Sequence, residues 1–299
     1  MNAIEVDDLR VTYTPRRAAA VEAVRGVSFA VGEGEIFGLL GPNGAGKTST
    51  LEVCEGFRTP TSGSVRVLGQ DPSASDLRSR VGVVLQDIAV EPFLTVREVI
   101  ARNAYYYERP RTVPEVLSLV GLTDKADVQV KRLSGGQLRR LDLGLGIVGR
   151  PSLLFLDEPT TGFDPGARRG AWDVVRGLKD EGTTVVLTTH YLDEAEALAD
   201  RVVVVAAGQV VAEGSPRELA AAGPQANRIR FRAQAAELPE LNGDVTVTGD
   251  LVSVATAQPT EVLHRLTGWA LERGEPLADL TVDRASFEDV YLALTEEQA

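Results

Sequence analysis

The chain has 299 residues, of which 43% are hydrophobic and 25% are charged, and its net charge is −12. This composition is typical of a globular protein, and the absence of a basic cluster argues against nucleic acid as the main partner. The longest apolar run, residues 202–207, is too short to span a bilayer, and the first residues lack the basic and apolar regions of a secretory signal. The single cysteine, Cys54, excludes an internal disulfide and fits a reducing cytoplasm.

Alternating apolar residues over 9–13 and 27–31 predict two strands near the N-terminus. Tyr13 stands at the end of the first strand. An aromatic residue in this position either covers a sheet edge or offers a ring on which a base stacks. From the pattern alone, the first role is favoured.

The pattern G-x-x-x-x-G-K-[ST] occupies residues 41–48, between a predicted buried strand (36–40) and a segment with helical spacing (48–57). A phosphate-binding loop requires this context, because glycines let backbone N–H groups point inward and the helix adds its positive N-terminal end. Lys47 is expected to reach the β- and γ-phosphates, and Thr48 to bind Mg²⁺. The alternative is a chance glycine-rich turn. The flanking strand and helix favour a nucleotide site.

Two further strands are predicted at 64–68 and 81–85, and helices follow within 95–120. Gln86 comes directly after the second of these strands. Another helix, extending to about residue 149, opens with Ser134-Gly135-Gly136-Gln137, where Ser134 is a good N-cap and the glycines expose the first N–H groups. Taken alone, this opening is either a second anion-binding helix terminus or an ordinary capped loop.

A strand at 153–156 is followed by Asp157-Glu158, and a strand at 183–188 is followed by Thr189-His190. A helix is predicted between them, at about 166–179. This β-α-β order implies a largely parallel sheet, and residues 202–212 then read as a hairpin.

Polar residues therefore follow four predicted strands: the glycine-rich loop, Gln86, Asp157-Glu158 and His190. Ligands bind at the carboxyl edge of an open α/β sheet, so these segments are expected to converge. Their residue types suit metal-assisted attack of water on a terminal phosphate, with one carboxylate holding Mg²⁺ and its neighbour orienting or deprotonating water. Each feature alone has an ordinary structural explanation, and their convergence favours catalysis.

These motifs together resemble the nucleotide-binding subunit of an ABC transporter over residues 3–222. GPNGAGKT matches the Walker A loop, LLFLDE the Walker B strand with its following glutamate, and LSGGQ the signature sequence. Gln86 stands at the Q-loop position, Thr161-Gly162-Phe163-Asp164 at the D-loop, His190 at the switch histidine and Tyr13 at the adenine-stacking aromatic. Phe163 departs from the leucine that is common in the family.

The resemblance implies an α/β P-loop NTPase fold with a mixed sheet and a helical subdomain at about 87–150, and ATP and Mg²⁺ as cofactors. It assigns catalysis to Lys47, Gln86, Glu158 and His190, and Mg²⁺ ligation to Thr48, Gln86 and Asp157. It assigns nucleotide contacts to Tyr13, Gly41, Pro42, Asn43, Gly44, Ala45, Gly46, Lys47, Thr48, Ser49, Ser134, Gly135, Gly136, Gln137 and Asp164.

The family also implies partners. Two cassettes pair head to tail, so that ATP on the loop of one is clamped by Ser134 and Gly136 of the other. Because this chain has one set of motifs, it is expected to act as a homodimer or beside a separate ATPase subunit. The helical subdomain is expected to meet a separate integral-membrane permease at the cytoplasmic face of a bacterial cell membrane, with no role for nucleic acid.

Residues 223–299 lie outside the cassette match and read as a small α+β accessory domain. Strands are predicted at 228–231, 245–248, 251–255 and 277–282, and helices at 259–272 and 286–294. The tail S-F-E-D-V-Y-L-A-L-T resembles that of exporter ATPases of the daunorubicin-resistance type. The main hypothesis is therefore an ATPase that drives export of drugs, antibiotics or lipid-like compounds. An importer ATPase and a non-transport ABC protein are the alternatives.

Overall fold

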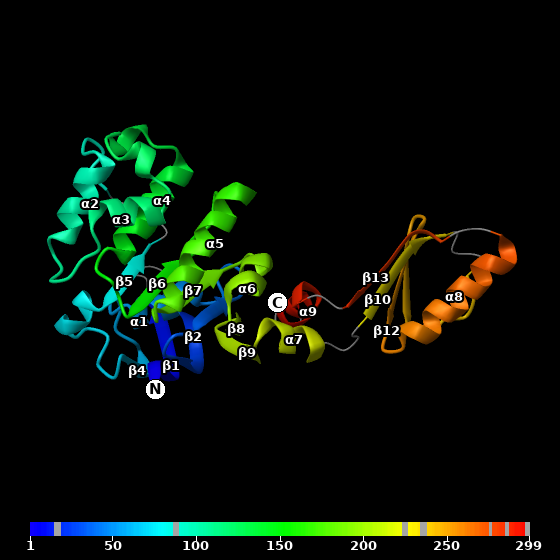
Figure 1. Ribbon diagram of the computed structural model, residues 1–299. Helices are drawn as coiled ribbons and strands as arrows, with labels where there is room; N and C mark the ends of the chain where they lie inside the picture. The colour runs from blue at the N-terminus through cyan, green and yellow to red at the C-terminus, as the bar shows by residue number, and fades with distance from the viewer. Residues whose placement is uncertain are drawn as a thin grey trace. The chain divides into compact units, whose positions relative to one another are not determined.

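The computed structural model describes residues 1–14, 19–85, 90–222, 227–233, 238–274, 277–284 and 287–296. The chain forms two compact units, Met1–Ser215 and Pro216–Glu297 (Figure 1). Helix α7 (Pro216–Ala222) packs against α9 (Phe287–Glu296) and so belongs to the second unit, whereas the sequence placed the division after residue 222.

The first unit is built on a six-stranded sheet with the order β5-β6-β7-β3-β8-β9. All neighbours are parallel except β9, which is antiparallel to β8. The bounds are β3 Ile36–Leu40, β5 Val81–Val84, β6 Leu153–Asp157, β7 Thr184–Thr189, β8 Arg201–Ala206 and β9 Gln209–Gly214. Every residue of β3, β6 and β7 is buried, as expected for parallel strands covered on both faces. The mixed α/β sheet is confirmed.

A second, antiparallel sheet with the order β2-β1-β4 shares a core with the first. Its strands are β1 Asn2–Tyr13, β2 Val21–Gly32 and β4 Ser62–Val67. Phe29 of β2 stacks on Phe37 of β3, with ring centroids 5.1 Å apart. Helix α1 (Lys47–Cys54) also enters this core, and burial raises the pKa of the Cys54 thiol to about 12. Cys54 is therefore a core residue and not a nucleophile.

Helices pack on the remaining apolar side chains of the large sheet, and α2, α3 and α4 form one group in Figure 1. The helices are α2 Val96–Ala104, α3 Val113–Leu119, α4 Gly135–Ile147, α5 Pro165–Asp180 and α6 Leu192–Leu198, with 3-10 turns at Ser75–Ser79, Thr123–Lys125 and Val130–Arg132. Helix α4 lies directly on β5, since a Cβ on Gly82 would come within 2.1 Å of the Gly146 carbonyl oxygen. Only glycine permits this approach of helix to strand.

In the second unit, antiparallel strands in the order β11-β12-β10-β13 pack against helix α8. The bounds are β10 Asn227–Arg232, β11 Asp244–Thr248, β12 Leu251–Thr256, α8 Pro259–Arg273 and β13 Ala278–Arg284. Ile229 and Phe231 join the core with Val262 and Leu266 of the helix. The alternate residues of β10 make ion pairs, including Arg230 with Asp283. In the described part of the chain, no helix is long and apolar enough to cross a membrane.

Candidate active site

The glycine-rich loop joins β3 to α1, as predicted. Gly46 is the N-cap of α1, with φ at 99°, and a Cβ there would lie 2.4 Å from the Ala23 carbonyl oxygen. Gly44 also has a left-handed φ, of 82°. These two positions require glycine, because an L side chain would strain the backbone or collide with it. The first-turn N–H groups of α1 therefore face the loop, where an anion can bind.

Lys47 is buried in the first turn of α1, and its Nζ donates to the carbonyl oxygens of Gly41 (2.7 Å) and Pro42 (3.1 Å). Burial lowers the pKa of Lys47, and the nearby Glu158 and Asp157 carboxylates oppose that shift. The charge of Lys47 in the loop thus interacts with the carboxylates at the end of β6. The sequence predicted that these two segments converge.

Asp157 ends β6 and is also buried. Its Oδ1 accepts a hydrogen bond from the Thr188 hydroxyl of β7. Burial raises the pKa of Asp157, and Thr188, Arg139 and Lys47 partly offset this. Thr188 was not among the predicted site residues, although its place near the end of a predicted strand was the available signal.

Glu158 contacts His190 across the ends of β6 and β7. Its Oε1 lies 3.1 Å from His190 Nδ1, and its Oε2 accepts a hydrogen bond of 3.2 Å from the Thr161 hydroxyl. Glu158 has a left-handed φ of 48°, and its N–H donates to Thr188 Oγ1 (3.1 Å). His190 and Thr161 thus hold the two carboxylate oxygens of Glu158 at the carboxyl edge of the sheet, where a water molecule could reach them.

Tyr13 lies beside α1, with its hydroxyl 2.9 Å from Ser49 Oγ. The Arg58 guanidinium is 4.4 Å from the Tyr13 ring centroid and pairs with Glu52 at 2.6 Å. One face of the ring is therefore covered by Arg58, and a base could stack only on the other face.

The signature residues open α4 as a capped helix. The Ser134 hydroxyl accepts from the Gln137 N–H, and the Gln137 side chain accepts from the Ser134 N–H. Ser134 and Gly135 are exposed, and no hydrogen bond or ion pair in the described part of the chain joins residues 134–137 to the glycine-rich loop. In this part of the chain, the signature residues therefore make no direct bond to the glycine-rich loop that precedes them in the same chain.

Asp164 serves as the N-cap of α5, accepting bonds of 2.9 Å from the N–H groups of Gly166 and Ala167. These backbone hydrogen bonds lower its pKa. Its nucleotide contact stays a prediction. Gln86 lies outside the described residues.

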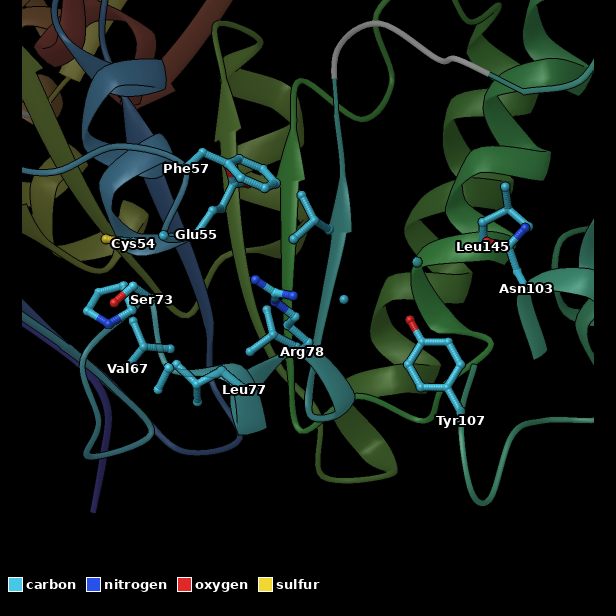
Figure 2. A pocket seen from close by; sticks show the side chains of 17 residues that line it. Cys54, Glu55, Phe57, Val67, Ser73, Leu77, Arg78, Asn103, Tyr107 and Leu145 are labelled. Carbon is cyan, nitrogen blue, oxygen red and sulfur yellow. The ribbon is translucent and has the colours of Figure 1, made fainter. Parts of the chain in front are cut away.

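A separate pocket of about 460 Å³ lies at the C-terminal end of α1 (Figure 2), and its lining includes no residue of the glycine-rich loop. Cys54, Glu55 and Phe57 line it from one side, and Tyr107 and Leu145 from the helical group. Among the described residues the buried Glu55 Oε1 has no hydrogen-bond partner, and burial raises the pKa of Glu55 to about 8. This pocket is not the predicted nucleotide site.

Comparison with known proteins bears on the whole chain. Residues 24–161 match the family model described as ABC transporter, and residues 227–286 match the C-terminal domain of ABC transporter domain-containing protein-like proteins. The chain is 38% identical to the daunorubicin/doxorubicin resistance ATP-binding protein DrrA of Streptomyces peucetius, over 99% of this chain and 93% of that protein. The chain belongs to the ABC transporter family.

Other relatives agree with this placement. This ABC protein is also 38% identical to the Nod factor export ATP-binding protein I of Paraburkholderia xenovorans, over 98% of this chain and 97% of that protein. An ATP-binding subunit of an ABC transporter superposes with a TM-score of 0.65 at 26% identity, covering 73% of this chain and 91% of that one. The predicted P-loop NTPase fold of an ABC cassette is confirmed.

Proposed function

We propose that this chain is the ATP-hydrolysing subunit of an exporter and that it drives transport through a separate membrane-spanning permease. The observation that carries the proposal is the identity of 38% to a drug-resistance ATP-binding protein and to a Nod factor export ATP-binding protein, over almost the full length of each pair of chains. Because the match includes the C-terminal part, it favours export over import. The transported compound is of the drug, antibiotic or lipid-like class.

The site fits a polyphosphate bound with one magnesium ion. Thr48 is exposed at the end of the loop. The buried Asp157 carboxylate lies close enough to Lys47 to act on the pKa of its ammonium group. No cluster of three or more His, Cys, Asp or Glu residues in the described ranges could hold a metal alone. This agrees with Mg²⁺, which is usually held by one or two protein oxygens together with substrate phosphates. Thr48, Asp157 and Gln86 are the proposed ligands, and the ion would neutralise charge on the phosphates.

The chain's own residues then supply binding and proton transfer. Lys47 is expected to exchange its bonds to the Gly41 and Pro42 carbonyls for phosphate oxygens. Glu158 accepts a proton from the attacking water, while the bond from Thr161 holds its other oxygen. His190 uses Nδ1 for Glu158, so its Nε2 is the nitrogen proposed to contact the terminal phosphate.

Two cassettes are proposed to act together. Within the described ranges, Ser134 and Gly136 make no hydrogen bond to the glycine-rich loop of the same chain, and the exposed N-terminus of α4 suits the ATP of a second copy. The nucleotide contacts of Tyr13, Ser49, Gln137 and Asp164 belong to the same proposal. Residues 1–215, the first compact unit, would form the ATPase domain, with its helical subdomain at about 87–150 facing the permease. The remainder would form an accessory domain at the cytoplasmic face of the membrane.

Affinity purification of the tagged chain from detergent-solubilised membranes tests the proposal. A stoichiometric polytopic membrane protein and Mg²⁺-dependent ATP hydrolysis are the expected results. Recovery with ribosomal or DNA-repair proteins, and no membrane protein, would refute the transporter role.

A further inference from the structure

Arg139 is a buried, positively charged residue beside the segment that carries Glu158. It lies on α4 and is 7% exposed. It is three residues after Gly136 on the signature helix. It lies four residues before Leu143 and eight before Ile147, and so it occupies the buried face of α4. Helical periodicity was therefore the signal that the sequence prediction missed.

The guanidinium group of Arg139 donates to backbone carbonyls from two separate segments. Nη2 bonds to the carbonyl oxygens of Asp157 (2.6 Å) and Glu158 (3.1 Å), and Nε bonds to that of Pro159 (3.2 Å). Nη1 bonds to the carbonyl oxygen of Leu85, the residue before Gln86. One side chain of the signature helix therefore ties together the ends of β6 and β5.

Acidic side chains compensate the Arg139 charge. Asp142, one turn along α4, forms an ion pair with Nη1 at 3.2 Å, and Asp157, Glu158 and Glu194 add attraction. Burial still lowers the pKa of Arg139. A planar guanidinium can donate in several fixed directions at once, whereas a lysine ammonium is a single point charge on a flexible stem. Lysine would keep the charge but not the set of bonds.

Arg139 holds the backbone at the point where it is strained. Glu158 has a left-handed φ, and its peptide groups are fixed by Thr188 at the N–H and by Arg139 at the carbonyl. The next turn is held from α6, where the Thr160 hydroxyl donates to the buried Glu194 at 2.8 Å. Release of the Glu158 carbonyl would let its side chain turn away from His190.

We propose that Arg139 is a positioning residue, which sets the Glu158 carboxylate against His190 and links it to the helix that carries Ser134. This inference rests on the proposed ATPase function and deepens it. Arg139 does not touch substrate. It acts through the backbone of Glu158 and of Leu85.

The test compares Arg139→Lys with Arg111→Lys in the full-length chain. Arg111 is a matched control because it is also buried, at 3% exposure, and is paired with Glu115 and Glu181, outside the catalytic loop. Arg139→Lys is expected to lower kcat by about 10- to 100-fold, as a misplacement of about 1 Å does. The KM for ATP should change less than about threefold, and the pH profile of kcat should change shape because the Glu158–His190 contact is altered. Arg111→Lys should keep the wild-type profile.

A purely structural role predicts a different result. The rate would then fall only in proportion to the loss of nucleotide-binding sites, with the wild-type pH profile, and this outcome would overturn the inference, as would a wild-type kcat. If Arg139→Lys does not fold, the same comparison is made with Arg139→Gln, which avoids burying a charge. A wild-type chain that does not hydrolyse ATP would instead refute the proposed function, so the two failures are distinguishable.

Discussion

Glu158 Oε1 and His190 Nδ1 lie 3.1 Å apart, although they follow different strands and are 32 positions apart in the sequence. Neighbouring parallel strands β6 and β7 bring them together, and the Thr161 hydroxyl holds the other carboxylate oxygen. A general base must be fixed in this way to reach a water molecule reproducibly. The pair is therefore the first place to test the proposed chemistry.

Glu158→Gln should abolish most hydrolysis while leaving ATP bound. The amide cannot accept the proton of water, so kcat should fall by about 10²- to 10⁴-fold. Size-exclusion chromatography with ATP should show a trapped dimer. Asp173→Asn on α5, whose side chain is 75% exposed, is the control. Hydrolysis by Glu158→Gln at the wild-type rate would refute the role of Glu158.

His190→Ala should lower kcat by about 10- to 100-fold, because the carboxylate loses its neighbour and the terminal phosphate loses its proposed contact. The double variant with Glu158→Gln should be little slower than Glu158→Gln alone, since residues that act as a unit are not additive. Steady-state kinetics of the four proteins measure this. Additive losses would show that the two residues act independently.

Lys47→Ala should weaken ATP binding by about 10- to 100-fold, the range expected for a lost hydrogen bond to a charged group. Lys47 also bonds to the Gly41 and Pro42 carbonyls and offsets the burial of Asp157, so its removal should lower the unfolding temperature as well. Fluorescent-nucleotide titration and a thermal melt separate these effects. Unchanged affinity would exclude the loop as the phosphate site.

Ser134→Ala should lower hydrolysis more than it lowers the affinity of one cassette for ATP, since Ser134 is proposed to act on the nucleotide of the other copy. The lost N-cap alone costs about 1 kcal/mol. Thr112→Ala is a matched control, because Thr112 forms the same capping box with Glu115 at the start of α3. Equal loss of hydrolysis in both variants would reduce the Ser134 effect to helix capping.

Glu55→Gln should stabilise the protein at high pH. The pKa of Glu55 is raised from 4.5 to about 8, so the folded state holds a proton that the unfolded state has lost between those values. Stability contributed by the protonated carboxyl is therefore lost as pH rises from about 4.5 to about 8. At pH 9 the free energy of unfolding of the variant should exceed that of the wild type by on the order of 1–3 kcal/mol, and at pH 4 the two should be equally stable. Parallel melting curves at both pH values would contradict this.

The sequence predicted β3, β5, β6 and β7 well because each is short and largely apolar, and the glycine-rich loop, Asp157-Glu158 and His190 each follow such a strand. It recovered only parts of the 12-residue strands β1 and β2. It missed α6, a helix of only seven residues with acidic side chains in its first turn. It also placed α7 with the cassette, because only the tertiary contact with α9 assigns that helix to the second unit. Helical periodicity places Arg139 on the buried face of α4, but its bonds to backbone carbonyls could not be read from any side-chain pattern.

Lys47 lies close to the carboxylates of Asp157 and Glu158, and this proximity determines how the site can attract a triphosphate. Asp157 and Glu158 attract Lys47 and also the buried Arg139, so much of the positive charge beside the loop is already compensated within the protein. The attraction must come from the amide groups at the start of α1, from a divalent cation and from the second cassette. ATP affinity should therefore depend steeply on the concentration of free Mg²⁺ and weakly on monovalent salt. In the cell, the magnesium concentration, more than the ionic strength, would then control how much ATP the cassette binds.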